Sequence, residues 1–420
     1  MNGHHCHRVS VSHVSKAERL RKRKQNGTRI SLRRVLKTLG SPAPPNNDLA
    51  LTLLCYRRCP TSISVVADCA GLMTESMALE NLRIKHHVDC FAESNQALRK
   101  FLQHANPQAL CVPDIIERDD NVTVIAPPPD LYVFGAPCQP WSPAGKQEGN
   151  KDKLKRNLVL WKCISHIRST LPRTIIMENS HSLAFKKFRK VRHKIISFIK
   201  SYGYEVHWKI LNTKNYGIPQ NRRRFYLVGI KNEAVKRRFC FPKKMPCLDL
   251  NELLNSACHH DRRRPGCPDT ERAHFVLEGC LEKLKCKKNV TPCDDTPCVV
   301  DVHSSARFAS AMASCSPALT ASRCVQNGHY IASRNGLMFL EEMCRLQGIH
   351  PLKVDNIVSF IAQEFGAAKA LTVAKHAIGN AMSVNILMCI LPRLLSSSGL
   401  ISSSAPTSLA NIIESIGLRS

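Results

Sequence analysis

Acidic residues are scarce in this chain of 420 residues, which has 32 Asp and Glu against 61 Lys and Arg and a formal charge of +29. The imbalance is steepest over residues 182–244, where 18 Lys and Arg accompany only Glu205 and Glu233. A positive field of this size favours a polyanionic partner, and nucleic acid is the first candidate. A basic tail on an ordinary enzyme would explain only part of the charge.

Long apolar runs are also missing. No stretch approaches the roughly 18 apolar residues of a membrane span, and no apolar signal segment opens the sequence. We therefore expect no membrane partner and reduced, intracellular thiols for the 20 cysteines. Eight of these lie between Cys240 and Cys298, beside His259 and His260. The cluster has no Cys-x-x-Cys pair, the usual spacing of zinc ligands, so a zinc or redox protein is a minor alternative and we expect no metal.

Composition and periodicity divide the chain into five parts. Residues 1–58 form a basic arm and linker that we expect to be disordered, and the run Arg19–Lys24 suits a nuclear address, a DNA-contacting arm or an organelle transit peptide. We favour the nucleus. Residues 59–240 form the main domain, and residues 241–330 are Cys-, Pro- and Arg-rich and irregular. Residues 331–395 return to the main domain, and residues 396–420 form a Ser-rich tail that we expect to be loose.

The main domain alternates short β-branched runs with helical stretches, which is typical of a parallel α/β sheet. Strands are predicted over 62–67, 88–92, 122–125, 131–134 and 174–177, and helices over 154–171 and 185–202. Residues 204–211 and 225–230 predict a final antiparallel pair. Helical patterning returns over 340–347 and 372–394. We therefore predict an α/β fold, a Rossmann-like mixed sheet whose last strand is reversed.

A cysteine stands at the end of one predicted strand, in Pro137-Cys138-Gln139. Ligands of open α/β sheets bind at the carboxyl ends of the strands, so a thiol there is placed like a nucleophile. Two further clusters follow predicted strand ends, Met177-Glu178-Asn179 and Gln220-Asn221-Arg222-Arg223-Arg224. The alternative for a cysteine in a chain with twenty is that it is buried and inert.

Together these clusters resemble the cytosine-5 DNA methyltransferase family, in which Pro-Cys, Glu-Asn and Gln-x-Arg-x-Arg follow one another in this order. The likeness covers most of residues 62–392. Four further segments resemble the family's other motifs, and Glu93 resembles its ribose-binding acid. The segments are Asp68-Cys-Ala-Gly71, Pro113-Asp114-Ile115, Glu341–Gly348 and Gly379-Asn380-Ala381-Met-Ser-Val384.

The resemblance implies that S-adenosyl-L-methionine (AdoMet) is the methyl donor and that Cys138 attacks C6 of cytosine, because C5 alone is a poor nucleophile. Glu178 would hydrogen-bond or protonate N3 if burial keeps its proton. Arg222 and Arg224 share one face of an extended segment, and one of them would reach the cytosine O2 while the other reaches the Cys138 loop or a phosphate. Asn179 would orient the loop, with Pro137, Gln139 and Gln220 in support.

The cofactor pocket implied by the resemblance draws on the first, third and last motifs. Its residues would be Asp68, Gly71, Glu93, Asp114, Ile115, Asn380 and Ala381. The first motif departs from the family's Phe-x-Gly-x-Gly, because Cys69 and Met73 replace the aromatic residue and the second glycine. Either change would loosen AdoMet packing or crowd the turn, and a relic that binds DNA without AdoMet therefore stays an alternative.

The expected partner is double-stranded DNA with the target cytosine flipped out of the stack, bound by a monomer. Arg223 and the run Arg262-Arg263-Arg264 are candidate DNA contacts, the latter in a region placed like the family's target-recognition domain. The tRNA-methylating branch of the family is the other alternative. It would carry Cys-Phe-Thr in that region, and Phe-Thr follows no cysteine between residues 240 and 330.

Overall fold

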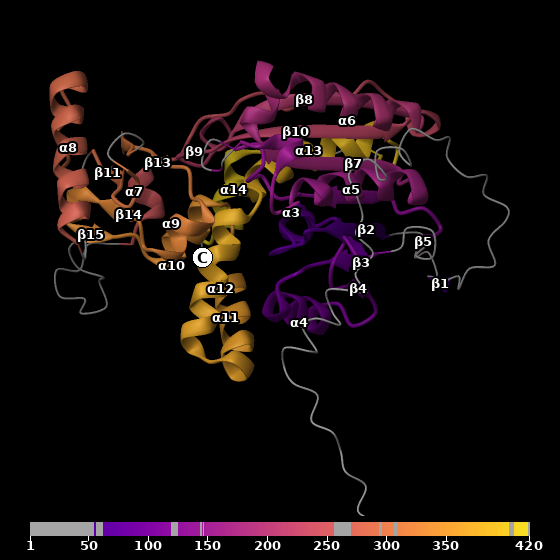
Figure 1. Cartoon of the computed structure of the whole chain (residues 1–420), viewed down its shortest axis with the longest axis horizontal. Helices are drawn as coiled ribbons and strands as arrows, with labels where there is room; N and C mark the ends of the chain where they lie inside the picture. The colour runs from indigo at the N-terminus through magenta and orange to yellow at the C-terminus, as the bar shows by residue number, and fades with distance from the viewer. Residues whose placement is uncertain are drawn as a thin grey trace, which may run out of the picture.

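The computed structural model describes residues 54–55, 62–118, 125–142, 145, 147–255, 270–293, 296–305, 309–402 and 407–418. Its largest element is a seven-stranded sheet in the order β4-β3-β2-β6-β7-β10-β8, whose strands follow one another down the view from β8 at the top to β4 (Figure 1). A smaller lobe built around helix α8 lies at one side of this sheet.

Five neighbouring strands of the large sheet are parallel: β4 (Leu110–Val112), β3 (His86–Ala92), β2 (Ile63–Asp68), β6 (Leu131–Phe134) and β7 (Thr174–Ser180). Strand β10 (Arg223–Lys231) is antiparallel to both of its neighbours, β7 and β8 (Tyr204–Asn212). The predicted mixed sheet with a reversed strand is therefore confirmed, and so is the final antiparallel pair. The short strand β4 was not predicted.

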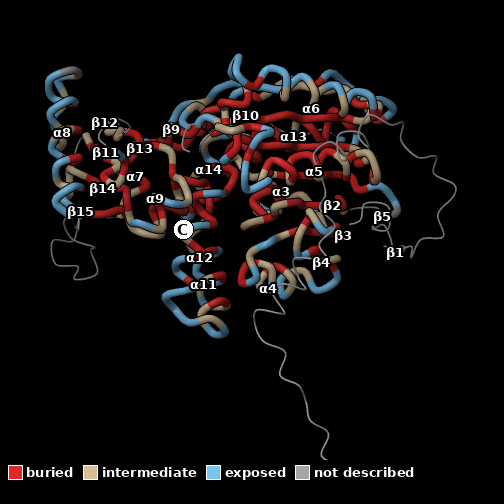
Figure 2. The backbone as a smooth tube through the Cα atoms, viewed as in Figure 1, coloured by how far each residue is buried: buried red, intermediate tan, exposed pale blue. Residues whose placement is uncertain are grey.

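Helices cover both faces of the sheet because successive strand residues point to opposite sides. On one face α5 (Asn157–Thr170) and α6 (Arg189–Ser201) bury Trp161 and Ile195 against strand residues such as Val66. On the other face α3 (Thr74–Asn81) and α13 (Val384–Ser397) pack against Val65 and its neighbours. Buried residues accordingly concentrate in and next to the sheet (Figure 2). Helix α4 (Gln96–Ala105), which was not predicted, begins at Asn95, whose side chain accepts hydrogen bonds from two backbone N–H groups.

The smaller lobe is more regular than its sequence indicates. Helix α8 (Glu271–Lys288) packs on a four-stranded sheet of β12 (Ala311–Ala313), β11 (Cys298–Asp301), β14 (His329–Ile331) and β15 (Gly336–Leu337). The expectation of an irregular region is wrong for these residues. The signal for α8 was present, since Ala273, Val276, Leu277, Cys280 and Leu284 share one helical face. A short helix, α7 (Leu250–Leu253), precedes the lobe.

The C-terminal part returns to the main domain as a series of helices, α9 (Ala321–Val325), α10 (Leu340–Leu346), α11 (Pro351–Phe365), α12 (Ala367–Asn380) and α13. The predicted helix over 372–394 is in fact two helices with a break at Ala381–Ser383. The tail is not loose where it is described, because α14 (Leu409–Ser415) buries Ile412 in the main core.

Several sequence predictions fall on residues outside the described ranges. They include Arg262, Arg263, Arg264 and nearly all of the basic arm, of which Leu54–Cys55 form β1 and pair with β5 (Ile125–Ala126). The predicted strand over 122–125 also lies outside except for its last residue. In the described part no single helix is long and apolar enough to span a membrane; α12 and α13 pass that test only as a pair bent by 50°.

Candidate active site

A cavity of about 440 Å³ opens at the carboxyl ends of β2, β3, β6 and β7. Strand order reverses between β2 and β6, and crevices at such switch points are where open α/β sheets bind ligands. The C-terminal helices and the start of α9 complete its wall. All the predicted catalytic and cofactor residues line it: Cys138, Glu178, Arg222, Arg224, Asp68, Gly71, Glu93, Asp114, Ile115, Asn380 and Ala381.

Cys138 sits half-buried in a loop that follows β6 and is tied to β7. The Asn179 side chain donates to the Ala136 carbonyl at 3.0 Å and accepts from the Ser180 N–H at 2.8 Å. Backbone N–H groups of Trp141 and Ser142 donate to the Cys138 carbonyl. The contact of Asn179 with the Ala136 carbonyl agrees with the prediction that this residue orients the loop, and Cys138 and Glu178 both line the cavity.

Gly145, at the far end of the same loop, packs against the backbone of Gln139 near the start of the loop. A Cβ atom at this position would lie 2.1 Å from the Gln139 carbonyl oxygen, so only glycine fits the close approach. Pro137 and Gln139 flank the thiol in the cavity wall. The loop is thus held from both ends around Cys138.

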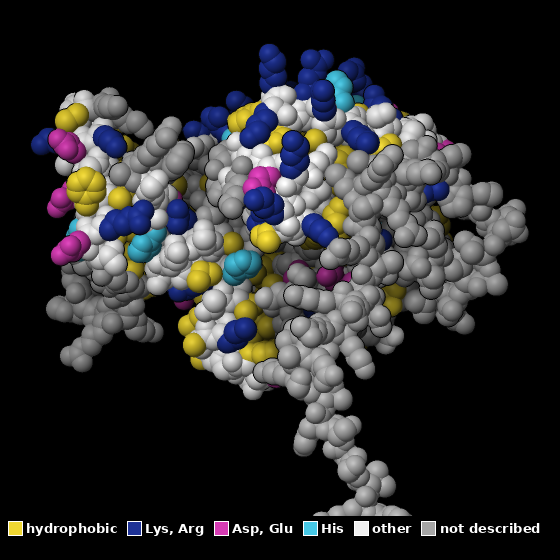
Figure 3. All heavy atoms as spheres, viewed as in Figure 1, with side chains coloured by type: hydrophobic (Ala, Val, Ile, Leu, Met, Phe, Trp, Pro, Cys, Tyr) yellow, Lys and Arg dark blue, Asp and Glu magenta, His cyan; other side chains and the backbone are white. Residues whose placement is uncertain are grey.

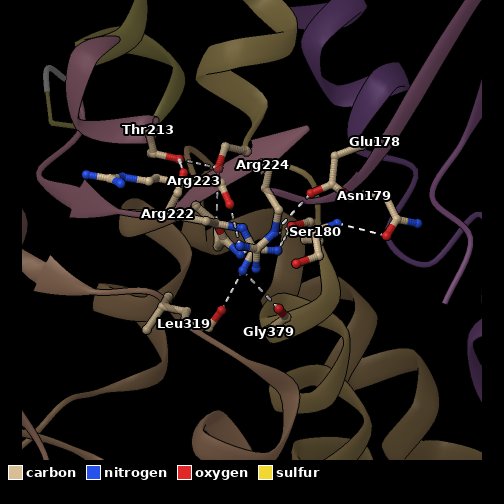
Figure 4. Close-up of polar contacts among 12 residues, drawn as sticks. Glu178, Asn179, Ser180, Thr213, Arg222, Arg223, Arg224, Leu319 and Gly379 are labelled. Carbon is tan, nitrogen blue, oxygen red and sulfur yellow. Dashed lines mark hydrogen bonds and ion pairs between the residues drawn. The ribbon is translucent and has the colours of Figure 1, made fainter. Parts of the chain in front are cut away.

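Glu178 and Arg224 form an ion pair inside the cavity, with 3.2 Å between the Glu178 Oε1 and Arg224 Nε atoms. Their strands are adjacent and antiparallel, and Tyr226 lies opposite Glu178, which places Arg224 on the same face (Figure 4). Burial raises the pKa of Glu178, although the positive charges of Arg224 and Arg222 oppose this rise. The carboxyl therefore holds its proton more tightly than an exposed glutamate does.

Arg222 makes backbone contacts that the sequence did not indicate. It is 2% exposed and donates to three backbone carbonyls, those of Leu319, Gly379 (3.2 Å) and Ala381 (2.6 Å) (Figure 4). Burial lowers its pKa to about 10, so the guanidinium stays charged at neutral pH. Arg222 joins the main sheet to the loop before α9 and to the break between α12 and α13, and both Arg222 and Arg224 line the cavity.

The neighbouring residues of this segment follow the predicted alternation. Arg223 is exposed and points away from the cluster (Figure 4). Gln220 is fully buried; its amide donates to the Leu346 carbonyl at 2.6 Å and its oxygen accepts from the Leu319 N–H at 3.0 Å. Gln220 and Arg222 therefore both bind backbone groups that connect the catalytic strands to the segment around Leu319 and to the C-terminal helices.

The cofactor side of the cavity centres on Gly71 and Glu93. Gly71 has φ +54° and a Cβ there would approach nothing nearer than the Cys69 carbonyl at 3.9 Å, so the backbone is open to a ligand. The Glu93 carboxylate accepts from the Gly71 N–H at 2.8 Å and the Asn95 N–H at 2.7 Å, which joins the ends of β2 and β3. Asp114 caps its own turn by accepting from the Ile116 N–H.

Two residues of the first motif differ from expectation. The Asp68 carboxylate is held by both Arg118 guanidinium nitrogens, at 2.7 and 2.8 Å, and by the Tyr132 hydroxyl, so we assign it to the scaffold and not to ligand binding. Burial raises the pKa of Asp68, but Arg118, His166 and the Tyr132 hydroxyl together outweigh that effect, so the net pKa is lowered. Met73, with φ +50°, packs away from the cavity against Phe91 and Leu102, so its side chain does not crowd the cofactor turn.

Two cavity residues were missed by the motif comparison. Glu75, in the first turn of α3, is 2% exposed, and its Oε1 atom has no hydrogen-bond partner. His376, on α12, lies beside Asn380 with 3.3 Å between their side-chain nitrogens. Neither belongs to a motif pattern, and only the fold brings them to the cavity.

The sheet order, the reversed strand and an open glycine turn beside an acid at the end of the second strand define the AdoMet-dependent methyltransferase class of fold. The open backbone at Gly71 and the unpaired oxygen of Glu75 fit a ligand that carries both polar and cationic groups. The chain belongs to the C-5 cytosine-specific DNA methylases, whose family model matches residues 63–396. This family uses AdoMet as its methyl donor.

Individual relatives match shorter stretches. The chain is 36% identical over 127 residues to Type II methyltransferase M2.ScrFI of Lactococcus lactis subsp. cremoris, covering 30% of this chain and 35% of the relative. It is 29% identical over 152 residues to M.HhaI of Haemophilus parahaemolyticus, covering 36% and 42%. The chain thus spans less than half the length of these relatives in the matched stretches.

Solved structures extend the likeness over most of the fold. The structure of S. pombe Dnmt2 methyltransferase is similar with a TM-score of 0.53 at 15% identity, over 80% of this chain and 98% of that one. A DNA modification methyltransferase encoded within an E. coli prophage, described as putative, gives 0.51 at 15% identity, over 81% and 98%. At this identity the likeness concerns the fold alone.

Proposed function

We propose that this protein is a DNA (cytosine-5-)-methyltransferase that transfers a methyl group from AdoMet to C5 of a flipped-out cytosine through a covalent bond between Cys138 and C6. The observation that carries the proposal is that three groups line one cavity. They are the Cys138 thiol, the buried Glu178 carboxyl and the Arg224 guanidinium.

Each group matches one demand of the reaction. Attack of the Cys138 thiolate on C6 pushes electron density onto N3 and O2 of the pyrimidine and makes C5 nucleophilic. Glu178, whose pKa is raised by burial, can give or share a proton at N3. Arg224 is a permanent donor beside it that can hold the O2 oxygen. After methyl transfer, a water molecule takes up the C5 proton, the bond between Cys138 and C6 breaks with its electron pair returning to sulfur, and the aromatic ring is restored.

The cofactor supplies an electrophilic methyl group when it is bound. The chain's own residues would hold it at the mouth of the first motif, with Gly71 giving backbone access and Glu93, Asp114, Asn380 and Ala381 around it. The Cys138 loop occupies the same cavity, so the nucleophile and the methyl donor site share one space.

A nucleic-acid substrate is supported by surface charge. Lys and Arg side chains gather at the top of the molecule (Figure 3), where α6 and β8 lie in Figure 1. Helix α6 contributes Arg189, Lys190, Arg192, Lys194 and Lys200, and the turn just before it contributes Lys186 and Lys187. A cytosine inside a duplex cannot reach a cavity of this kind, so the target base would have to leave the stack. The lobe around α8 lies at one side of the main sheet (Figure 1), and we propose that it contacts the rest of the duplex.

The test is methyl transfer from labelled AdoMet to duplex DNA or to tRNA, with the unmodified protein and with Cys138→Ala. We expect label in DNA that is lost in the variant. A duplex containing 5-fluorocytosine should trap the unmodified protein covalently, because fluorine at C5 cannot leave as the proton does. Transfer to tRNA alone would replace DNA by RNA as substrate. AdoMet binding without transfer to either would favour the relic.

A further inference from the structure

Glu75 is a carboxyl group buried at the cofactor cavity without a partner for one of its oxygens. It lies in the first turn of α3, directly after the glycine turn of the first motif, and is 2% exposed. The Oε1 atom accepts no hydrogen bond, while the carboxyl also turns back toward its own backbone N–H. Burying a carboxyl group that lacks a hydrogen-bond partner costs free energy, and a ligand group that pairs with its Oε1 atom would recover that free energy on binding.

The other acids described in the cavity wall are already engaged. Asp68 is held by Arg118, and Glu178 is paired with Arg224. Glu93 accepts backbone N–H groups with both oxygens, and Asp114, half-exposed, caps its own turn. Among these carboxyls, Glu75 is therefore the one that is deeply buried and free to receive a positive group from a ligand.

We propose that the Glu75 carboxylate binds a cationic group at the methionine end of AdoMet. AdoMet carries two such groups, the α-ammonium and the methyl-bearing sulfonium, and either would supply the positive charge that this carboxylate lacks. Glu75 would then be a positioning and affinity residue for the cofactor. The inference rests on the family's use of AdoMet and is independent of whether DNA or tRNA receives the methyl group.

Binding of this kind couples to a proton. Burial raises the pKa of Glu75 to about 7, so a large share of the free protein holds this carboxyl protonated at neutral pH. A cation bound next to it favours the ionised form, and the proton is released. AdoMet affinity should therefore rise as pH increases from 6 to 8.

Other ionisable groups share the cavity and need separate controls. They are Asp68, Cys69, Glu93, Asp114, Cys138, Glu178, Arg222, Arg224 and His376. Helix α13, which packs on α3, adds only Cys389 and Arg393. His376 is the one histidine among them, so it requires its own variant.

The experiment is isothermal titration of the full-length protein with AdoMet and with its product S-adenosylhomocysteine, without nucleic acid, at pH 6, 7 and 8. Two buffers of different ionisation enthalpy give the number of protons released. The variants are Glu75→Gln, His376→Gln and, as matched control, Glu80→Gln, an exposed acid on the same helix. Circular dichroism checks that each variant is folded.

We expect Glu75→Gln to weaken AdoMet binding at pH 8 by about tenfold or more and to abolish proton release and the pH dependence, while Glu80→Gln changes neither. An equal loss for S-adenosylhomocysteine identifies the ammonium as the bound group, and a loss for AdoMet alone identifies the sulfonium. Unchanged or tighter binding by a folded Glu75→Gln protein overturns the proposal, as does proton release that disappears only in His376→Gln. If the unmodified protein fails to bind AdoMet, the cofactor assignment itself is wrong.

Discussion

The Glu178 carboxylate and the Arg224 guanidinium lie 3.2 Å apart on neighbouring antiparallel strands. Their pairing sets two opposing effects on one carboxyl, because burial raises the pKa of Glu178 and the positive charge of Arg224 lowers it. Because the net pKa is raised, Glu178 holds a proton more tightly than an exposed glutamate does, beside an arginine that can donate to O2. Without Arg224 the pKa of Glu178 would be higher still, and without burial it would be lower, so that the carboxyl would lose its proton at a lower pH.

Glu178→Gln should slow methyl transfer in a single turnover by about 100-fold or more, since glutamine can hydrogen-bond but cannot deliver a proton. In the unmodified protein the rate should fall as pH rises through the raised pKa of Glu178, because the protonated form is the active one. The variant should lack this fall.

A pH series of single-turnover rates measures both effects, with Glu233→Gln, an exposed acid outside the cavity wall, as control. A variant with the same alkaline fall as the unmodified protein would assign that fall to another group.

Arg222→Ala should destabilise the fold, because it leaves the carbonyls of Leu319, Gly379 and Ala381 buried without their charged donor. We expect a loss of about 3 kcal/mol in the free energy of unfolding. Arg223→Ala removes an exposed neighbour and should change it by less than about 0.5 kcal/mol. Urea unfolding of the two variants gives the comparison, and equal stabilities would show that Arg222 is not the structural link between the lobes.

The main sheet and the catalytic residues could be predicted because their signals are local. Alternating apolar runs indicated β2, β6 and β7, and the short clusters around Cys138, Glu178 and Arg224 stand at their ends. Local spacing also placed Arg222 and Arg224 on one face. It could not separate their roles, because the acceptors of Arg222 come from residues about 100 to 160 positions later in the chain.

Misses had physical reasons of two kinds. For α8 and α11 the sequence does contain helical spacing that was not recognised. In α11 the buried residues Val354, Ile357 and Ile361 have this spacing, and Pro351 stands at the helix start, where proline is favoured. The break between α12 and α13 depends instead on tertiary contacts, since Arg222 binds the carbonyls of Gly379 and Ala381. Glu75 carries no sequence signal at all, because nothing local tells a buried first-turn acid from a solvated one.

Arg223→Gln should weaken DNA binding without affecting AdoMet binding, since the side chain is exposed on the face opposite the catalytic cluster. If Arg223 contacts a phosphate, the slope of the logarithm of affinity against that of salt concentration should fall by about 1. Fluorescence anisotropy at several salt concentrations measures this slope. An unchanged slope would place Arg223 outside the DNA interface.

Glu75 should make the stability of the ligand-free protein depend on pH. Its pKa is raised from 4.5 to about 7, so the folded state holds this proton more tightly than the unfolded state does. The stability that the protonated group contributes is fully present below about pH 4.5 and is lost as pH rises through about 7. The difference corresponds to about 3 kcal/mol.

Glu75→Gln cannot ionise, so the variant should gain stability relative to the unmodified protein between pH 5 and pH 8. Urea unfolding at both values measures the gain, and saturating AdoMet should reduce it because the bound cation then partners the ionised carboxylate. A gain that is the same at pH 5 and pH 8 would mean that Glu75 does not titrate in this range.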